Sequence, residues 1–346
     1  MDNNFYIYTD NSTIVEIERF HICTWEFKNA TSIIEFGAEI VNPQIITNDH
    51  LHLKLFIPWI NSNNKIIDLY SQLKDPENSK FIFNDSVKSS KYVNSEQSKY
   101  GVILNFHGRN PLCIMPTTNI INERVIDICI DLKQLKERHS GEKPNLYFRF
   151  YIEPKIEFIT TRKQGINRTT IIYDMKVNEK RNLPDTINFG EIQLCKISNC
   201  FFFNILPNSF DLSFFDTNQL KSVRTLEFES FQKYLGDSRV KKDDLMVVFN
   251  KSGKLDNYSF FTRYSKERIG AGQFALAVLV NLLCGILLFL PSLRSKAQIN
   301  IFSKEMLQNL PIEVYISMSI GILIIIYFIW PKILAVPNII KSLIRR

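Results

Sequence analysis

The stretch LHLKLFIPW, residues 51–59, indicates the fold class of this chain. Every second side chain in it is apolar: Leu51, Leu53, Leu55, Ile57 and Trp59. Because successive side chains of a strand point to opposite faces of the sheet, this alternation predicts a strand with one buried face. The stretches VIDICIDL (125–132) and NLYFRFYIE (145–153) repeat the pattern. The N-terminal part of the chain is therefore expected to be mainly β.

Similar patterns extend through residues 1–264. Further strands are expected at 4–9, 16–27, 32–41, 80–83, 101–106, 169–175, 191–205 and 211–215, and helices at 65–73, 132–138 and 217–235. Many short strands with polar turns favour a β-sandwich-like soluble region with few short helices. Pro154 follows a strong strand, so we expect a β-rich domain at 1–153 and a second β-rich (α+β) unit at 154–264 that ends in a hairpin.

Two apolar runs follow this region. Residues 269–290 contain no charged side chain, and at about 1.5 Å per helical residue they could cross the roughly 30 Å hydrocarbon core of a bilayer. A second apolar run occupies 312–330, after a loop at 291–311, and a basic amphipathic tail follows at 331–346. These runs predict a C-terminal two-helix transmembrane hairpin.

The net charge of +7 is concentrated at this C-terminal end. Residues 261–346 contain ten Lys/Arg and three Asp/Glu, so the rest of the chain is neutral overall and a nucleic-acid partner is not favoured. Seven of the ten cations flank the two runs and three lie between them, which favours both termini in the cytoplasm. The expected location is the inner membrane, with a multi-pass topology and the lipid bilayer as a partner. The six cysteines form no CxxC pair, which is typical of a reduced compartment.

Small and polar residues recur within the two runs at a helical spacing. They are Gln273, Ala277, Asn281 and Gly285 in the first run, and Ser317 and Gly321 in the second. Side chains four residues apart share one helix face, and such a stripe packs against protein. Two interpretations remain open: packing of the two helices within one hairpin, or self-association of several chains around a polar pathway.

The chain carries no motif that names a reaction. GxSxG, GxxxxGK, GxGxxG, HExxH and CxxC are all missing from the sequence, so we expect no catalytic residues, no cofactor and no metal. His50 and His52 would share one strand face and could share a metal, but no second pair of ligands is recognisable nearby, so the pattern favours two solvent-facing histidines.

Two groups of side chains are candidates for binding a small anionic ligand. The turn NFHGRNP contains His107 and Arg109. The second group lies in loops around the strand at 169–175 and comprises Arg162, Lys163, Arg168, Lys176, Lys180 and Arg181. If folding brings these cations together, a nucleotide or a phospholipid headgroup is the natural ligand. The alternative is a pair of solvated turns.

This organisation predicts a membrane-anchored sensor or effector. A cytoplasmic β-rich domain would bind a protein partner or a signal, and the two helices would oligomerise or perturb the inner membrane. The organisation is similar to that of two-helix membrane effectors of bacterial antiviral defence. Two alternatives are a membrane-tethered scaffold without membrane-disrupting activity and an enzyme that acts at the membrane surface.

Overall fold

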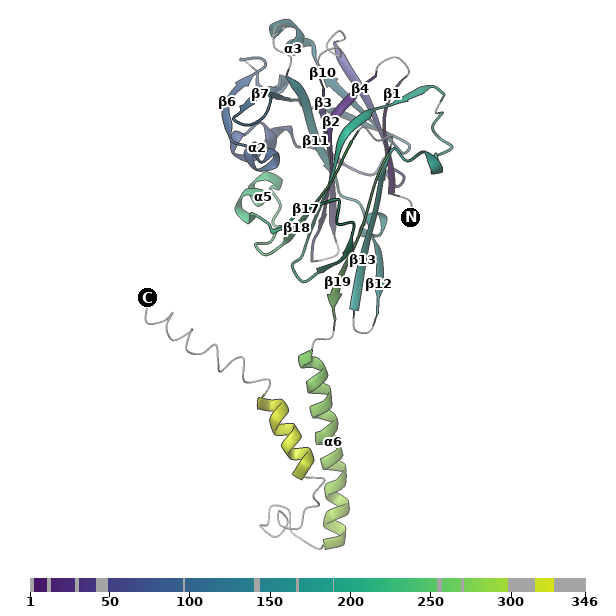
Figure 1. The fold of residues 1–346 in the computed structure, drawn as a ribbon, viewed down its shortest axis with the longest axis vertical. Helices are drawn as coiled ribbons and strands as arrows, with labels where there is room; N and C mark the ends of the chain where they lie inside the picture. Colours follow the sequence, from purple (N-terminus) through teal and green to yellow (C-terminus); the bar gives the residue numbers. More distant parts are fainter. Residues whose placement is uncertain are drawn as a thin grey trace, which may run out of the picture. The chain divides into compact units, whose positions relative to one another are not determined.

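The computed structural model of the chain divides into two units (Figure 1). Unit 1 comprises Met1–Gln164 and Thr169–Lys266, and unit 2 comprises Gly165–Arg168 and Glu267–Arg346. The structure describes residues 3–10, 14–28, 31–41, 49–95, 97–139, 144–165, 168–188, 190–253, 257–268, 271–297 and 315–326, with side chains for all of these except 182, 271 and 289–297.

Unit 1 is built from two mixed β-sheets, which confirms the prediction of a mainly β fold. Within the described residues, the nine-stranded sheet has the order β16 (Asp211–Phe215), β19 (Tyr258–Glu267), β13 (Arg168–Val177), β1 (Asn3–Asp10), β4 (His50–Phe56), β10 (Val125–Asp131) and β9 (Thr118–Asn122), with β12 (Thr161–Gln164) on β13 and β14 (Ile192–Leu194) on β1. The ten-stranded sheet, counted in the same residues, has the order β17 (Leu220–Thr225), β18 (Leu245–Ser252), β15 (Lys196–Leu206), β2 (Glu16–Glu26), β3 (Ser32–Ile40), β11 (Asn145–Ile152), β8 (Leu112–Ile114), β7 (Val102–Phe106) and β6 (Val87–Tyr92), with β5 (Ile66–Asp68) on β11.

Each sheet joins strands from both sides of Pro154. In the nine-stranded sheet β1 pairs in parallel with β13, and in the ten-stranded sheet β2 pairs in parallel with β15. Parallel neighbours require long connections, so these pairings bring distant parts of the sequence together.

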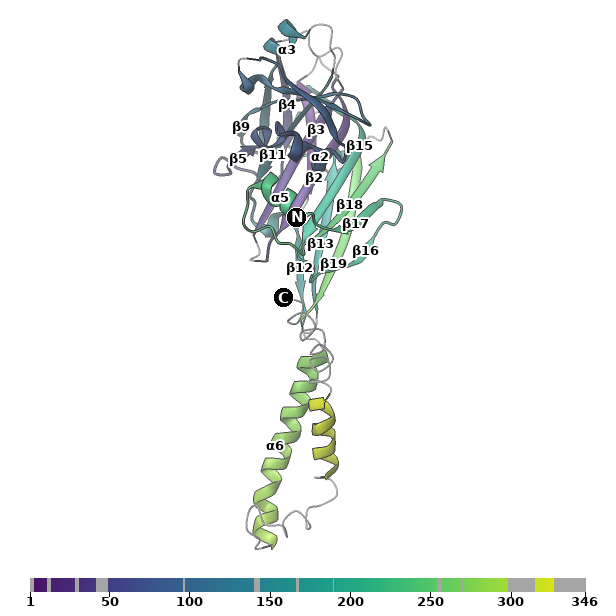
Figure 2. The same cartoon turned by 90° about the vertical axis from the view of Figure 1, so that its left-hand side faces the viewer.

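The two sheets pack face to face, and helices add a third layer on the outer face of the ten-stranded sheet (Figures 1 and 2). Side chains such as Phe20, Ile22 and Leu53 fill the core between the sheets. A second core lies between the ten-stranded sheet and three helices, α1 (Tyr70–Leu73), α2 (Pro76–Phe83) and α5 (Phe228–Leu235). Two further short helices, α3 (Lys133–Arg138) and α4 (Ile156–Ile159), and the 3₁₀ turns η2 (Ser98–Tyr100) and η3 (Lys180–Asn182) connect other strands.

A bulge in β2 sets which of its side chains face outward. The pairing of β2 with β3 shifts in register between Ile17 and Arg19. A bulge places one extra residue in a strand and so changes which side chains alternate to each face. After it, Phe20 and Ile22 point into the core between the sheets, whereas Cys23 belongs to the second core under the helices.

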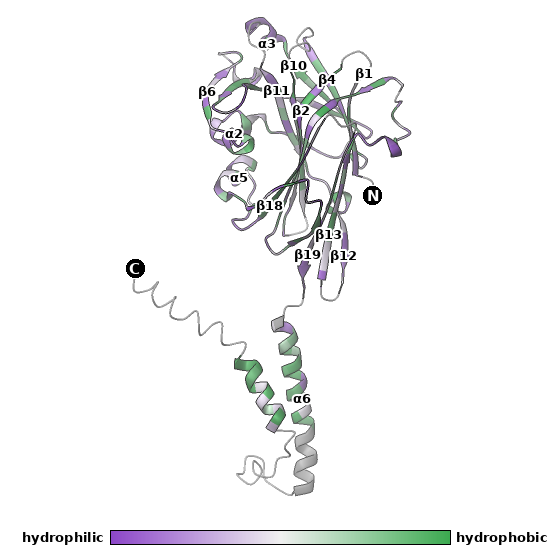
Figure 3. Ribbon diagram, in the orientation of Figure 1, coloured by the Kyte–Doolittle hydropathy of each residue, from purple (hydrophilic) through white to green (hydrophobic). Residues whose placement is uncertain are grey.

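Unit 2 contains α6 (Ala271–Ala297) and a further helix over residues 315–326. Most of the described side chains on both helices are hydrophobic (Figure 3). At Gly321 an added Cβ would lie 3.5 Å from Leu279 Cδ1, so the two helices touch at this position.

The predicted transmembrane hairpin is wrong. In the part of the chain that the structure describes, no helix combines the length and the apolar character needed to cross a membrane. The expected multi-pass inner-membrane location, with cytoplasmic termini, depended on this hairpin and is wrong as well. The expected tail at 331–346 and the loop residues from 298 to 311 lie outside the described residues.

Candidate functional site

A cavity of about 340 Å³ lies where the third layer of unit 1 leaves part of the ten-stranded sheet uncovered. Its floor comes from β2, β15, β18 and β11, and β17, α2 and α5 supply the remaining walls. We call it the α2–α5 pocket. Clefts of this size are typical of small-molecule sites.

The charged side chains that line the α2–α5 pocket are all cations. The described lining residues include no Asp or Glu, and the cations are Arg19, Arg149, Lys221 and Arg224. The pocket therefore favours an anion on charge grounds.

These cations differ in how far carboxylates already neutralise them. Arg149 Nε lies 2.5 Å from Glu35 Oε2, and Arg224 Nη1 lies 3.3 Å from Glu227. Arg19 Nε is 3.6 Å from Glu39 and its side chain is 37% exposed. Lys221 Nζ lies 5.0 Å from the ring centre of Phe201 and has no carboxylate within ion-pair distance among the described residues. Lys221 and Arg19 are thus the cations most available to a ligand.

A bulge turns Lys221 toward the pocket. The pairing of β17 with β18 shifts in register between Leu220 and Ser222. In a regular strand Lys221 and Ser222 would face opposite sides, but here both line the same cavity. Bulges often reorient a side chain in this way next to functional sites.

A buried polar network underlies the pocket and is centred on Glu35 of β3, which has no exposed surface. Its carboxylate accepts hydrogen bonds from Trp25 Nε1 at 2.5 Å, Arg149 Nε at 2.5 Å and the Tyr234 hydroxyl of α5 at 3.0 Å. A buried charge is stable only when such partners replace water. The network therefore fixes Arg149 and attaches α5 to the sheet.

Gly37 lies beside Glu35 on β3 and leaves room for the Tyr147 hydroxyl. A Cβ at Gly37 would lie 2.6 Å from that oxygen, closer than a side chain could tolerate. Through this opening the Tyr147 hydroxyl reaches His21 Nδ1 at 3.0 Å, while Arg149 Nη1 donates to it at 3.4 Å. The missing side chain therefore allows a tyrosine of β11 to contact a histidine of β2.

His21 is neutral in this setting. Burial lowers the pKa of its imidazole well below the usual value, and the nearby charges of Arg149, Arg19, Arg109 and Lys221 lower it further. The Tyr147 hydroxyl lies 3.0 Å from His21 Nδ1, and in the tautomer in which this O–H donates to Nδ1 the imidazole proton lies on Nε2. His21 thus lines the pocket as a neutral imidazole.

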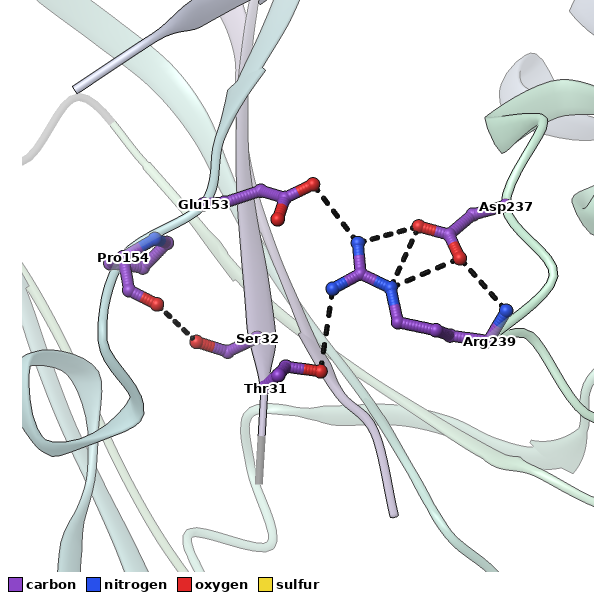
Figure 4. A network of polar contacts seen from close by, with 6 residues as sticks. All are labelled: Thr31, Ser32, Glu153, Pro154, Asp237 and Arg239. Carbon is purple, nitrogen blue, oxygen red and sulfur yellow. Dashed lines mark hydrogen bonds and ion pairs between the residues drawn. The ribbon is translucent and has the colours of Figure 1, made fainter. Parts of the chain in front are cut away.

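The wall formed by α5 is held at three points. Tyr234 bonds to Glu35, and Lys233 Nζ lies 3.0 Å from Asp75 at the start of α2. Just beyond the helix, Arg239 lies 2.6 Å from Asp237, 2.9 Å from Glu153 and 3.3 Å from the Thr31 hydroxyl (Figure 4). The guanidinium carbon of Arg239 is 4.5 Å from the ring centre of Phe27. These contacts fix the helix against β3, the residues next to the ends of β2, β3 and β11, and the start of α2.

The structure separates the two residues predicted in the NFHGRNP turn. His107 is exposed, whereas Arg109 is largely covered and lies 2.6 Å from Glu39, with its guanidinium stacked near the rings of Phe83 and Phe106. Glu39 also contacts Arg19 of the pocket. Arg109 therefore joins the polar network next to the pocket but does not line it.

The predicted basic loops do not line the α2–α5 pocket. Arg162 Nη2 lies 2.8 Å from Glu26, and Lys176 and Arg181 both pair with Glu179. Lys163, Arg168 and Lys180 are exposed. Three of the six predicted cations thus already have carboxylate partners.

The small and polar residues predicted to form a stripe on the two helices of unit 2 differ in solvent exposure. Gln273, Ala277, Asn281 and Gly285 are exposed on α6, whereas Ser317 and Gly321 are partly covered. The more covered face of α6 contains residues such as Ala275, Leu279 and Leu282.

The structure also places the histidine pair considered for metal binding. His50 and His52 have ring centres 6.2 Å apart, and Cys129 Sγ lies 4.0 Å from His50 Nδ1. Among the residues that the structure describes, no group of three or more His, Cys, Asp or Glu side chains is arranged to hold a metal ion.

No protein-family model matches this chain, and no curated protein is significantly similar to it in sequence.

Proposed function

We propose that unit 1 is a sensor module that binds a small anionic ligand in the α2–α5 pocket. The observation that carries this proposal is the charge of the lining: four cations and no carboxylate among the described residues, with Lys221 lacking a carboxylate partner there. Protein cavities of this size that gather one sign of charge concentrate ligands of the opposite sign.

Three features make the pocket suited to recognition. His21 places a neutral imidazole beside Lys221 and Arg19. Arg149 is held in place by its ion pair with Glu35, so it lines the pocket without a loss of side-chain freedom on binding. The contacts of α5 keep the wall in place.

The proposal is tested by titrating the full chain with inorganic phosphate, sulfate and acetate, using isothermal calorimetry and thermal melting. Lys221→Ala and Arg19→Ala should each weaken binding by about tenfold or more, because a charge-assisted hydrogen bond contributes about 1.5–3 kcal/mol. Lys242→Ala is the matched control, since Lys242 is an exposed lysine of unit 1 that does not line the pocket. Equal binding by all three variants would place any anion site elsewhere, and no binding by the wild type would favour the scaffold alternative.

A second candidate function is self-association through unit 2. Its helices expose large apolar side chains on several sides, including Phe274 at 68% and Leu288 at 81%. Exposed apolar patches of this kind mark interaction surfaces, and a second copy of the chain offers the same surface in return. An antiviral role stays a prediction.

Self-association is tested by sedimentation velocity of the full chain. The double variant Leu283→Glu with Leu287→Glu should reduce the mass of the assembly, because both side chains are more than half exposed on α6. Phe261→Glu, at an exposed aromatic residue of unit 1, is the control and should leave the mass unchanged. A monomeric wild-type chain would contradict the idea.

A further inference from the structure

The α2–α5 pocket has a polar end and an apolar end, and this asymmetry specifies more about the ligand than its charge. The strand registers define the two ends. His21 pairs with Phe201, and two residues further along each strand Cys23 pairs with Phe203. Phe203 in turn pairs with Val248, and Ile205 with Met246.

The polar end gathers at the row of His21 and Phe201. Arg19 precedes His21 by two residues on the same face of β2, and Lys221 projects over the ring of Phe201. Among the described residues the imidazole of His21 is hydrogen-bonded through Nδ1, to the Tyr147 hydroxyl, and its Nε2 has no hydrogen-bond partner. One anionic head can therefore meet two cations and, with the imidazole proton on Nε2, one neutral N–H donor.

The apolar end begins two residues further along the strands. Cys23, Phe203 and Val248 form one row of its floor, Ile205 and Met246 form the next, and Phe231 of α5 closes the wall. At the edge of these rows Ser222 pairs with Val248 and Arg224 pairs with Met246, and the charge of Arg224 is met by Glu227 at 3.3 Å. From Phe201 to Ile205 the strand advances four residues, which is about 13 Å at roughly 3.3 Å per residue. This distance accommodates an extended chain of several methylene groups.

The lining disfavours sugars and nucleotides. Ribose hydroxyls and base edges are commonly recognised by carboxylates and other acceptors. The described lining contains no carboxylate, and its neutral polar side chains, apart from His21, are Asn84 and Ser222. Most of the other lining residues are hydrocarbon or aromatic.

We propose that the ligand of this pocket is a medium-chain carboxylate, with its head group at Arg19, His21 and Lys221 and its hydrocarbon chain over Cys23, Phe203, Val248 and Met246. This inference rests on the proposed function of the pocket and adds the chemical class of the ligand.

The test is a calorimetric titration of the full chain with acetate, hexanoate, octanoate and decanoate, beside decanol, adenosine monophosphate and inorganic phosphate. Affinity should rise about three- to fourfold for each methylene group that enters the apolar end. Decanol, which lacks the charge, should bind at least tenfold more weakly than decanoate. A nucleotide that binds more tightly than decanoate would overturn the inference.

Two variants localise the effect. Val248→Phe adds bulk at the apolar end and should abolish the dependence on chain length while acetate still binds. Lys221→Ala should weaken acetate and decanoate by the same factor. Thermal melting checks that each variant folds, and Val248→Leu is the alternative if the larger substitution prevents folding. An unchanged dependence on chain length in a folded Val248 variant would place the chain elsewhere and overturn the inference.

The same titrations separate this inference from the proposed function. If phosphate and acetate bind in a manner that depends on Lys221, but longer chains bring no gain, then anion binding stands and the medium-chain ligand is wrong. If no anion binds in a manner that depends on Lys221, then both fail.

Discussion

Removal of the Glu35 carboxylate should destabilise unit 1 more than any surface change. Glu35 is fully buried and accepts hydrogen bonds from Trp25, Arg149 and Tyr234. Glu35→Ala would leave Arg149, itself only 5% exposed, as a buried charge without its partner. Breaking a buried pair from one side costs about 3–5 kcal/mol, and the Trp25 and Tyr234 donors that lose their acceptor keep the expected loss near the upper end.

The assay is urea unfolding followed by far-ultraviolet circular dichroism, with Glu229→Ala as the control. Glu229 lies on α5 as an exposed residue, so its removal should change the free energy of unfolding by no more than about 0.5 kcal/mol. The double variant Glu35→Leu with Arg149→Met removes both charges and should recover most of the loss, because a buried ion pair and an apolar pair of similar size differ little in stability. A loss below about 1 kcal/mol for Glu35→Ala, or a double variant no more stable than the single one, would refute the account of the network.

Three further predictions concern the same region, each measured by urea unfolding. Gly37→Ala should cost about 1–3 kcal/mol, since its Cβ would meet the Tyr147 hydroxyl at 2.6 Å, and less in a Tyr147→Phe background, where that hydroxyl is gone; an equal cost in both backgrounds would contradict the clash. The pKa of His21 in the folded protein lies well below the value near 6.5 of the unfolded chain. As pH falls below about 6.5, only the unfolded chain therefore takes up this proton. The free energy of unfolding, which is highest above that pH, should then decrease by up to about 1.4 kcal/mol per pH unit. His21→Gln should remove this component, and parallel pH profiles of variant and wild type would disprove it. Arg239→Ala should lose about 1–2 kcal/mol, and Arg239→Lys should restore little of it, because a lysine cannot reproduce the forked contacts with Asp237 and the stacking on Phe27; full restoration by lysine would show that charge alone acts there.

Much of the sheet structure was predictable, since alternation reports directly which strand face is buried. Helix boundaries were less so. Residues 80–83 were expected to form a strand, yet they end α2, because Asp75 caps the helix and Pro76 occupies its first turn. The expected helix at 217–235 is a strand, β17, followed by α5, which Gly236 ends in a left-handed conformation. At α2 the local capping signal thus outweighed the pattern of apolar side chains.

The polar network under the pocket left a partial signal in the sequence. The stretch IIEFGAEI, residues 33–40, places Glu35 and Glu39 on one face of a strand that is apolar elsewhere, with Gly37 between them. Buried carboxylates need partners, so such a strand predicts cations nearby. The partners themselves were not predictable, because Arg149 is 114 residues from Glu35 and Tyr234 is 199 residues away.

The positive charge of the α2–α5 pocket depends on the pairing register of β17 with β18 more than on how many cations the nearby sequence contains. The pattern of β17 alone places Lys221 on the face opposite Ser222 and Arg224. The bulge between Leu220 and Ser222 brings the lysine to the pocket side, beside His21 and Phe201. A search for clustered cations finds the loops around β13, where Glu26 and Glu179 already hold three of the six charges. The cation best able to meet a ligand is instead a single lysine at an irregular position, which is why the basic residues that stand out in the sequence are not the ones that line the cavity.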